Sequence, residues 1–308
     1  MQTVVFGFGS QGRAQALNLK DSGWRPMVFL RKESTRKEAV LKAGLELCTN
    51  PEEAAKQAEL AVILLPDSQQ SDFWKTYLSP HLPQGASLCF AHGFNIHYQQ
   101  ISPRKDLDVI LAAPSLQGDG LRRAYEQKET VPMLTAIHQD ATDRAYRTAE
   151  DLALAIGGPK THILPTTFKE ETETDLFAEQ AVLCGGVNAL VQAGFETLVN
   201  AGYSSEVAYY CCVKELKALA AVLHEQGIGG LRQRISETAR YGDITRGPRV
   251  IDDHVRKNMK TILQEILGGD FKKELLAEKE KGWPTLQKAL TENATSRIEA
   301  TRKKLDGY

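Results

Sequence analysis

The 308-residue sequence predicts an α/β fold in which a doubly wound parallel sheet is followed by an all-helical domain. Up to about Leu164, short apolar runs alternate with amphipathic helical stretches, which is typical of parallel strands joined by crossover helices. From Asp175 onward, strand-like alternation is rare and helical periodicity dominates. We therefore predict a nucleotide-binding domain over residues 1–164 and a helical domain over residues 165–308.

The predicted strands are apolar runs of the length expected for buried strands, and helical segments lie between several of them. The strands are residues 3–8, 26–30, 59–66, 86–90, 108–114 and 131–137, and the clearest intervening helices are residues 10–23 and 50–58. In the second domain, long stretches with an apolar residue every three or four positions predict helices over residues 175–202, 205–227 and 248–269.

The composition is that of a globular protein with an ample core, with a formal net charge of −1, 42% hydrophobic and 25% charged residues. Near-neutrality gives no electrostatic reason to expect a nucleic-acid partner or a membrane surface. No apolar run approaches the roughly 20 residues that span a bilayer. Because the sequence enters a predicted strand at once, we expect no signal peptide. Because the five cysteines show no CxxC spacing, we expect reduced thiols and a cytoplasmic location.

A glycine-rich turn follows the first predicted strand and opens a helix. It reads "GFGSQG" and contains Gly7, Gly9, Ser10, Gln11 and Gly12. Glycines allow the backbone to approach a pyrophosphate, which the helix N-terminus then stabilises. The motif alone is weak, but its position between strand and helix predicts a Rossmann dinucleotide site.

The end of the second predicted strand indicates which dinucleotide binds. An NAD site usually has an acidic residue here, whereas this loop carries Arg31, Ser34, Thr35 and Arg36. Arginine can hold a 2′-phosphate through charge-assisted hydrogen bonds, so we predict NADPH; the alternative is a solvated charge cluster. Three further cofactor residues are predicted at the end of another strand, where open parallel sheets bind dinucleotides: Pro66, Asp67 and Gln70.

Two pairs of residues lie four apart in the helical domain, and each pair therefore shares a helix face. Asp175 and Glu179 offer two carboxylates, which suit a hard divalent cation such as Mg²⁺; an acid-rich helix N-terminus is the alternative. Cys211 and Glu215 form the second pair. Their face is an ordinary surface, a soft metal site, or a carboxylate site that has lost one carboxylate.

Several motifs together resemble the ketol-acid reductoisomerase family in its short, single-copy form. They include "FGFGSQGRAQALNLKDSG", "FAHGFNIH", "FKEETETDLFAEQAVLCGG" and "YGDITRGPRVID", and they extend along essentially the whole chain. The resemblance implies a magnesium-dependent alkyl shift in 2-acetolactate followed by reduction with NADPH. It also implies a knotted helical domain and a homodimer, or a larger homo-oligomer, whose subunits share active sites.

The resemblance assigns roles to individual positions. Asp175 and Glu179 match the family's metal-binding motif, His92 matches an active-site histidine, and Ser236 matches a serine that contacts the substrate carboxylate. Glu215 matches an acid that lies near the metals and substrate of the neighbouring subunit. We therefore expect His92, Asp175, Glu179 and Glu215 to be catalytic.

At two positions the chain departs from the family pattern. Cys211 replaces the first of two glutamates, and Ser115 replaces the lysine of an "APKGPG" loop. A thiolate at Cys211 could favour zinc, but a small buried thiol packing against substrate is the preferred interpretation. Loss of charge beside an anionic substrate should impair the alkyl shift more than the reduction.

Three functions remain open from the sequence. The favoured one is an NADPH-dependent reductase of a 2-oxo acid or a related imine, with impaired isomerisation and with Mg²⁺ binding in doubt. The second is an authentic ketol-acid reductoisomerase. The third is a catalytically inactive nucleotide-binding protein, which the retention of the acid pair, His92 and Ser236 opposes.

Overall fold

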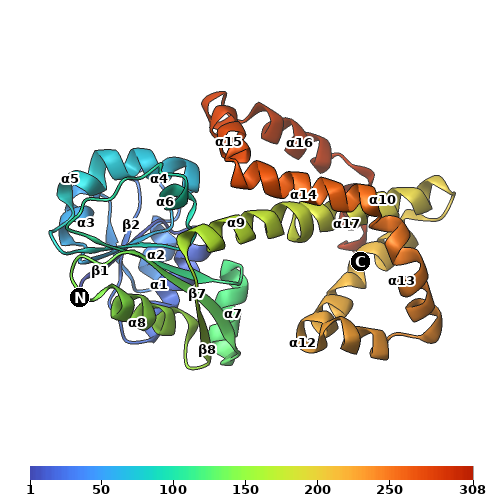
Figure 1. Ribbon diagram of the computed structural model, residues 1–308, viewed down its shortest axis with the longest axis horizontal. Coiled ribbons are helices and arrows are strands. Elements are labelled where there is room, and N and C mark those ends of the chain that lie inside the picture. Colours follow the sequence, from blue (N-terminus) through green and yellow to red (C-terminus); the bar gives the residue numbers. More distant parts are fainter. Residues whose placement is uncertain (308) are drawn as a thin grey trace. The chain divides into compact units, whose positions relative to one another are not determined.

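The computed structural model describes residues 1–307, and these form two compact units (Figure 1). Unit 1 is Met1–Thr174, and unit 2 begins at Asp175. The predicted boundary after Leu164 coincides with the last strand, whereas the division between the units falls inside the next helix, α9 (Phe168–Ala178). Because α9 continues through the division between the units, no change in amino-acid composition marks that division in the sequence.

Unit 1 is built on an eight-stranded sheet with the order β3-β2-β1-β4-β5-β6-β7-β8. The strands are β1 (Thr3–Phe6), β2 (Met27–Phe29), β3 (Glu46–Cys48), β4 (Leu60–Ile63), β5 (Ser87–Phe90), β6 (Asp108–Pro114), β7 (Val131–Gln139) and β8 (Thr161–Pro165). The doubly wound sheet is confirmed with one correction, because β7 runs antiparallel to β6 and β8 follows β7. The prediction also missed β3 and β8, which are half-exposed edge strands without a continuous apolar run.

Alternate residues of the central strands face two separate cores. Val4 and Phe6 of β1 belong to one cluster and Val5 to the other, as the period of two in a strand requires. Helices cover both faces of the sheet (Figure 1). The helices of unit 1 are α1 (Ser10–Asp21), α2 (Lys37–Lys42), α3 (Pro51–Gln57), α4 (Asp67–Phe73), the π-helical turn η1 (Trp74–Leu78), α5 (Ser79–His81), α6 (Phe94–His97), α7 (Gly118–Gln127) and α8 (Ala145–Gly157).

Unit 2 is helical throughout its described residues, as predicted. After α9 come the π-helical turn η2 (Glu179–Leu183), α10 (Gly185–Asn200), α11 (Ser205–Tyr209), the π-helical turn η3 (Tyr210–Lys214), α12 (Leu216–Arg234), α13 (Glu237–Val250), α14 (Asp253–Leu267), α15 (Asp270–Glu280), α16 (Pro284–Ala294) and α17 (Arg297–Leu305). Its core cluster is small and centres on Phe195, Val199, Ala208 and Tyr209.

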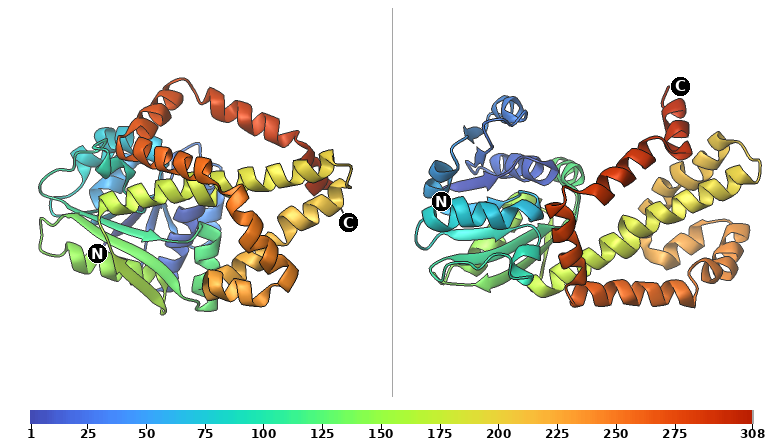
Figure 2. Two further views of the ribbon diagram at one scale, coloured as in Figure 1. Left: turned by 45° about the vertical axis from the view of Figure 1, so that its right-hand side comes forward. Right: turned by 90° about the horizontal axis from the view of Figure 1, so that it is seen from above.

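Much of the apolar surface of unit 2 is exposed. Large apolar side chains that face solvent include Leu183 (64% exposed), Ile228 (62%) and Leu290 (60%). Figure 2 shows α9, η2 and α10 as one continuous helix. This helix, Phe168–Asn200, is long and apolar enough to cross a membrane, contrary to the sequence-based expectation. Length and composition alone do not assign it to a membrane, because helices of soluble proteins share them.

Candidate functional site

The glycine turn between β1 and α1 has a shape that only glycine permits. Gly7 has a φ of 112°, and a Cβ there would lie 2.6 Å from the carbonyl oxygen of Leu64, the residue after the neighbouring strand β4. A Cβ on Gly12 would overlap the carbonyl of Gly7, so the first turn of α1 closes directly against the strand end. This is the close backbone packing that a pyrophosphate-binding turn requires.

A cleft of about 830 Å³ opens beside this turn. Its lining includes seven of the twelve predicted cofactor residues: Gly7, Gly9, Arg31, Ser34, Thr35, Arg36 and Pro66. The Arg36 guanidinium approaches the turn, with one terminal nitrogen 3.8 Å from the position of a Cβ on Gly9. Two lining residues that the sequence analysis did not single out are Glu33 and Gln69.

Gln70 serves a different purpose from the cofactor contact predicted for it. Its side chain is buried, donates to the Leu65 carbonyl (2.8 Å) and to Asp67 Oδ1 (3.0 Å), and accepts from Asn95 (3.0 Å). These bonds tie the start of α4 to α6. Thus, of the two adjacent glutamines, Gln69 faces the cleft and Gln70 supports it.

Ser10 and Gln11 connect the glycine turn to the loop after β6. Gln11 Nε2 donates to the Leu116 carbonyl at 2.7 Å, and a Cβ on Gly118 would overlap the backbone of Ser10. Ser115 lies exposed at the start of this loop, held by a backbone hydrogen bond to Pro132 (3.0 Å). The loop that carries Ser115 is therefore packed directly on the nucleotide-binding turn.

We expect Gly118→Ala to weaken NADPH binding by about tenfold or more, because the new methyl group must displace backbone at the glycine turn. Gly120→Ala is the matched control, since both glycines lie in the first turn of α7 and a Cβ on Gly120 would meet nothing within 4 Å. A titration of NADPH fluorescence measures both. Equal NADPH affinities of the two variants would mean that the loop before α7 can move to accommodate the methyl group without displacing the glycine turn.

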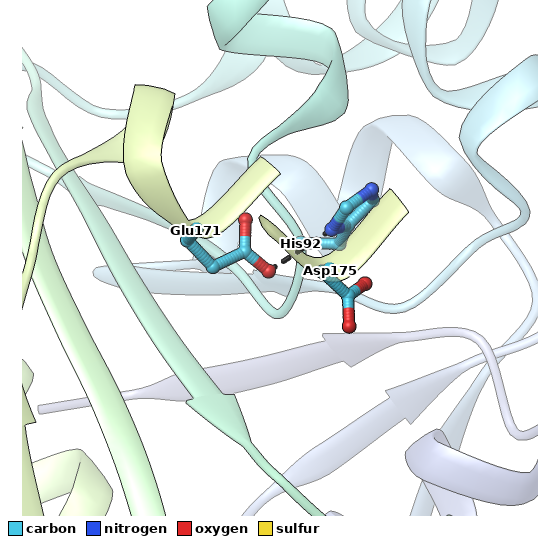
Figure 3. Close-up of side chains that lie close together, drawn as sticks. All are labelled: His92, Glu171 and Asp175. Carbon is cyan, nitrogen blue, oxygen red and sulfur yellow. Dashed lines mark hydrogen bonds and ion pairs between the residues drawn. The ribbon is translucent and has the colours of Figure 1, made fainter. Parts of the chain in front are cut away.

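His92, Glu171 and Asp175 form a compact polar cluster (Figure 3). His92 follows β5, and α9 supplies the two acids one turn apart. Glu171 is 3% exposed; its Oε1 lies 2.9 Å from His92 Nδ1, and its Oε2 accepts the Gly93 N–H at 2.7 Å. Because an ionised carboxylate can only accept, His92 Nδ1 donates this hydrogen bond.

The donor set fits a divalent cation. One ligand atom from each of His92, Glu171 and Asp175 lies within 4.8 Å of the others. Asp175 is partly buried, and Glu179 is exposed one turn further along the same helix. Since carboxylate oxygens are the ligands that Mg²⁺ prefers, Asp175 and Glu179 would hold it, while His92 and Glu171 support the site from the side.

Glu171 was not identified from the sequence. Its partner is 79 residues away along the chain, and only the fold brings the two together. An acid beside Asp175 on the helix face was the one available signal.

Glu171→Gln is expected to lower the free energy of unfolding by about 2–3 kcal/mol, because the amide would direct an N–H at a donor that the carboxylate now satisfies. Glu170→Gln, at an exposed neighbour whose partner is Thr166, should cost well under half of that. Urea unfolding of both variants gives the comparison. An equal loss of unfolding free energy in the two variants would show that the buried hydrogen bonds of Glu171 contribute no more stability than those of an exposed acid.

The remaining predicted residues lie in unit 2. Cys211 is exposed within η3, which corrects the prediction of a buried thiol. Glu215 is the C-cap residue of that turn. Ser236 caps α13, its hydroxyl accepting from the Ala239 N–H at 3.2 Å. Among residues 1–307, none of the three belongs to a cluster of three or more potential metal ligands. The sequence analysis also missed the π-helical turns next to Glu179 and Glu215, which have no simple sequence signature.

Comparison with known proteins gives a consistent result along the whole chain. Residues 1–162 match the family "Acetohydroxy acid isomeroreductase, NADPH-binding domain", and residues 168–308 match "Ketol-acid reductoisomerase, C-terminal domain". The ketol-acid reductoisomerase (NADP(+)) of Xylella fastidiosa strain Temecula1 is 47% identical over 305 residues, which cover 99% of this chain and 87% of the relative.

Solved structures agree with this result. An NADH-preferring ketol-acid reductoisomerase from an uncultured archean superposes with a TM-score of 0.96 at 35% identity, covering 99% of this chain and 94% of the other. A pyrroline-5-carboxylate reductase from Coxiella burnetii gives 0.60 at 15% identity, covering 87% and 97% of the two chains. The second likeness is one of fold.

Proposed function

We propose a function for this chain from one premise: it belongs to the ketol-acid reductoisomerase family. It is an NADPH-dependent oxidoreductase. We infer further that it is an authentic ketol-acid reductoisomerase, converting 2-acetolactate to 2,3-dihydroxy-3-methylbutanoate in branched-chain amino-acid biosynthesis in the cytoplasm. The cluster of His92, Glu171 and Asp175 carries this inference, because acids and a histidine fixed at one point are more than nucleotide binding needs.

The cleft in unit 1 provides the cofactor half of the reaction. NADPH, when bound, supplies the hydride. The glycine turn would take its pyrophosphate, and Arg31 and Arg36 its 2′-phosphate. Ser34 and Thr35 add hydroxyl donors at the same end of the cleft.

The acid pair on α9 and η2 provides the other half. A magnesium ion held by Asp175 and Glu179 would polarise the substrate carbonyl and stabilise developing alkoxide charge. Glu171 holds the His92 ring by its protonated Nδ1, so that Nε2 can accept a proton or a hydrogen bond. We assign substrate contacts to Ser236, Glu215, Cys211 and Ser115, where Cys211 and Ser115 contribute no charge.

Those two uncharged positions support a second candidate function. Without the lysine and the glutamate expected at Ser115 and Cys211, the chain would reduce a 2-oxo acid or a related imine that needs no rearrangement, and it would isomerise poorly. The sequence analysis favoured this candidate. The similarity to named ketol-acid reductoisomerases along both domains favours the authentic enzyme instead.

The deciding experiment follows NADPH oxidation with Mg²⁺ on two substrates, 2-acetolactate and 3-hydroxy-3-methyl-2-oxobutanoate. The second is already rearranged and needs reduction only. Similar rates on both are expected for an authentic isomeroreductase. Turnover of the rearranged acid alone would support the second candidate. Inactivity on both would contradict the authentic enzyme and would leave a reductase of another substrate or an inactive nucleotide-binding protein.

The double variant Ser115→Lys, Cys211→Glu tests whether these positions limit the alkyl shift. For the second candidate, restoring two charges beside an anionic substrate should raise 2-acetolactate turnover at least tenfold. For the authentic enzyme, the wild-type rate is already comparable on both substrates, and we expect no gain. The rate on the rearranged acid serves as the internal control.

We also propose that the chain forms a homodimer or a larger homo-oligomer that completes the active sites. The exposed apolar side chains of unit 2, including Leu183, Ile228 and Leu290, support this proposal, since soluble monomers rarely expose so many. Sedimentation at micromolar concentration measures the state directly. A monomer with full activity would contradict shared active sites.

A further inference from the structure

The helix that carries the acid pair contains a π-helical turn, η2, which begins at Glu179. The Cys184 N–H donates to the Glu179 carbonyl at 2.9 Å, a span of five residues instead of the four of an α-helix. One extra residue in a turn rotates everything after it by about 100° relative to an uninterrupted helix. The turn therefore sets how α10 is rotated relative to Asp175 and Glu179.

Two consecutive glycines close this turn. A Cβ on Gly185 would overlap the Gln180 carbonyl oxygen, and a Cβ on Gly186 would overlap that of Ala181. Both obstacles are backbone atoms of η2, which cannot swing aside as a flexible side chain could. Neither glycine has a positive φ, so the requirement is one of space alone.

The π-helical turn η3 shows that such turns do not need glycine in general. Leu216 and Lys217 occupy the equivalent positions after η3, where the exit residue Glu215 has nearly helical angles (φ −68°, ψ −26°). At the exit of η2, Cys184 departs further from helical geometry (φ −106°, ψ −62°). The backbone geometry at the end of η2 therefore excludes a side chain at Gly185 and Gly186, whereas the geometry at the end of η3 does not.

The rotation set by η2 also governs packing further along the helix. Phe195 and Val199 of α10 form the core of unit 2 with Ala208 and Tyr209, which lie just before η3. Gly194 faces Cys212, with a built Cβ 3.5 Å from the sulfur, an ordinary contact. Packing on η3 therefore fixes the rotation of α10 about its own axis. The extra residue in η2 then determines the direction of Asp175 and Glu179 relative to the packed face of α10.

We propose that Gly185 and Gly186 are positioning residues for the metal ligands Asp175 and Glu179. They permit the π-helical turn that rotates the acid pair relative to the packed face of α10. The inference rests on the proposed function only in assigning Mg²⁺ to these acids.

The test compares Gly185→Ala and Gly186→Ala with Gly194→Ala in the full-length protein. Calorimetric titration gives the Kd for Mg²⁺, and fluorescence gives the Kd for NADPH as a readout of unit 1. We expect Mg²⁺ binding to weaken about tenfold or more in the first two variants, with NADPH binding unchanged. Gly194→Ala should keep both affinities and hold or raise Tm, because alanine favours a helix. Mg²⁺ affinities within twofold of wild type in Gly185→Ala and Gly186→Ala would overturn the inference.

A second variant separates positioning from folding. Deleting the exposed Val182 in Gly185→Ala removes the extra residue, and the resulting α-helix accepts alanine. We expect Tm to recover while Mg²⁺ affinity stays at least tenfold weaker, since α10 is now rotated. Recovery of both would show a merely structural role and overturn the proposal. Wild-type protein that binds NADPH but no Mg²⁺ would instead contradict the metal assignment, and the inference would fall with it.

Discussion

Asp175→Asn is expected to lower kcat for 2-acetolactate by about 10³-fold or more, because stabilisation of an alkoxide by a metal is worth several kcal/mol. Asparagine keeps the volume of the side chain but removes the negative charge and one of its two acceptor oxygens. Asp175 belongs to the cluster with His92 and Glu171, and it lies one helical turn before Glu179. Steady-state kinetics over a range of Mg²⁺ concentrations measures the change.

The control for this prediction is Glu196→Gln, which removes an exposed charge from α10 whose partner is Gln192. Its kinetics should match wild type. The Kd for NADPH should be unchanged in both variants, because the cofactor cleft is lined by residues of unit 1. An Asp175→Asn enzyme that still rearranges 2-acetolactate at more than a tenth of the wild-type rate would contradict the metal assignment.

Arg36→Ala is expected to raise KM for NADPH by about 10- to 100-fold while leaving KM for NADH within about twofold. A charge-assisted hydrogen bond contributes roughly 1.5–3 kcal/mol, and each 1.4 kcal/mol corresponds to a factor of ten. Arg36 lines the cleft beside Gly9, and NADH has no 2′-phosphate for it to hold. The ratio of kcat/KM for the two cofactors is the appropriate measurement.

Lys42→Ala is the matched control, since Lys42 is an exposed cation paired with Glu38 on the neighbouring helix α2. It tests whether any nearby positive charge supports NADPH. Equal weakening of both cofactors by Arg36→Ala would place the arginine against a part common to them. No change in KM for either cofactor would mean that the loop is the solvated charge cluster given above as the alternative.

The sequence is informative about unit 1 wherever a local rule determines the structure. The buried strand at Val4–Phe6, the glycine at position 7 and the following helix each follow from neighbouring residues. The antiparallel direction of β7 does not, because it depends on the end of β6 at which the connecting chain re-enters the sheet. β3 was missed because half of an edge strand faces solvent and needs no apolar run.

In the candidate site too, features set by neighbouring residues can be predicted from the sequence, whereas features set by distant parts of the fold cannot. The spacing of Asp175 and Glu179 predicts a shared helix face because four residues make about one helical turn, and their role as metal ligands stays a prediction. Glu171 was missed because its role depends on a histidine from another part of the fold. Gln70 was chosen over Gln69 because neighbouring residues differ by 100° around a helix, and the rotation of α4 is fixed by packing.

The sparse core of unit 2 has a consequence for how stability must be measured. With its apolar surface covered by a second copy, as proposed, part of the folding free energy is association free energy. Tm should then rise with protein concentration. Dilution should dissociate the chains and thereby destabilise unit 2. Values measured at one concentration describe the pair of chains, so the effect of any substitution in this unit must be compared at matched concentration.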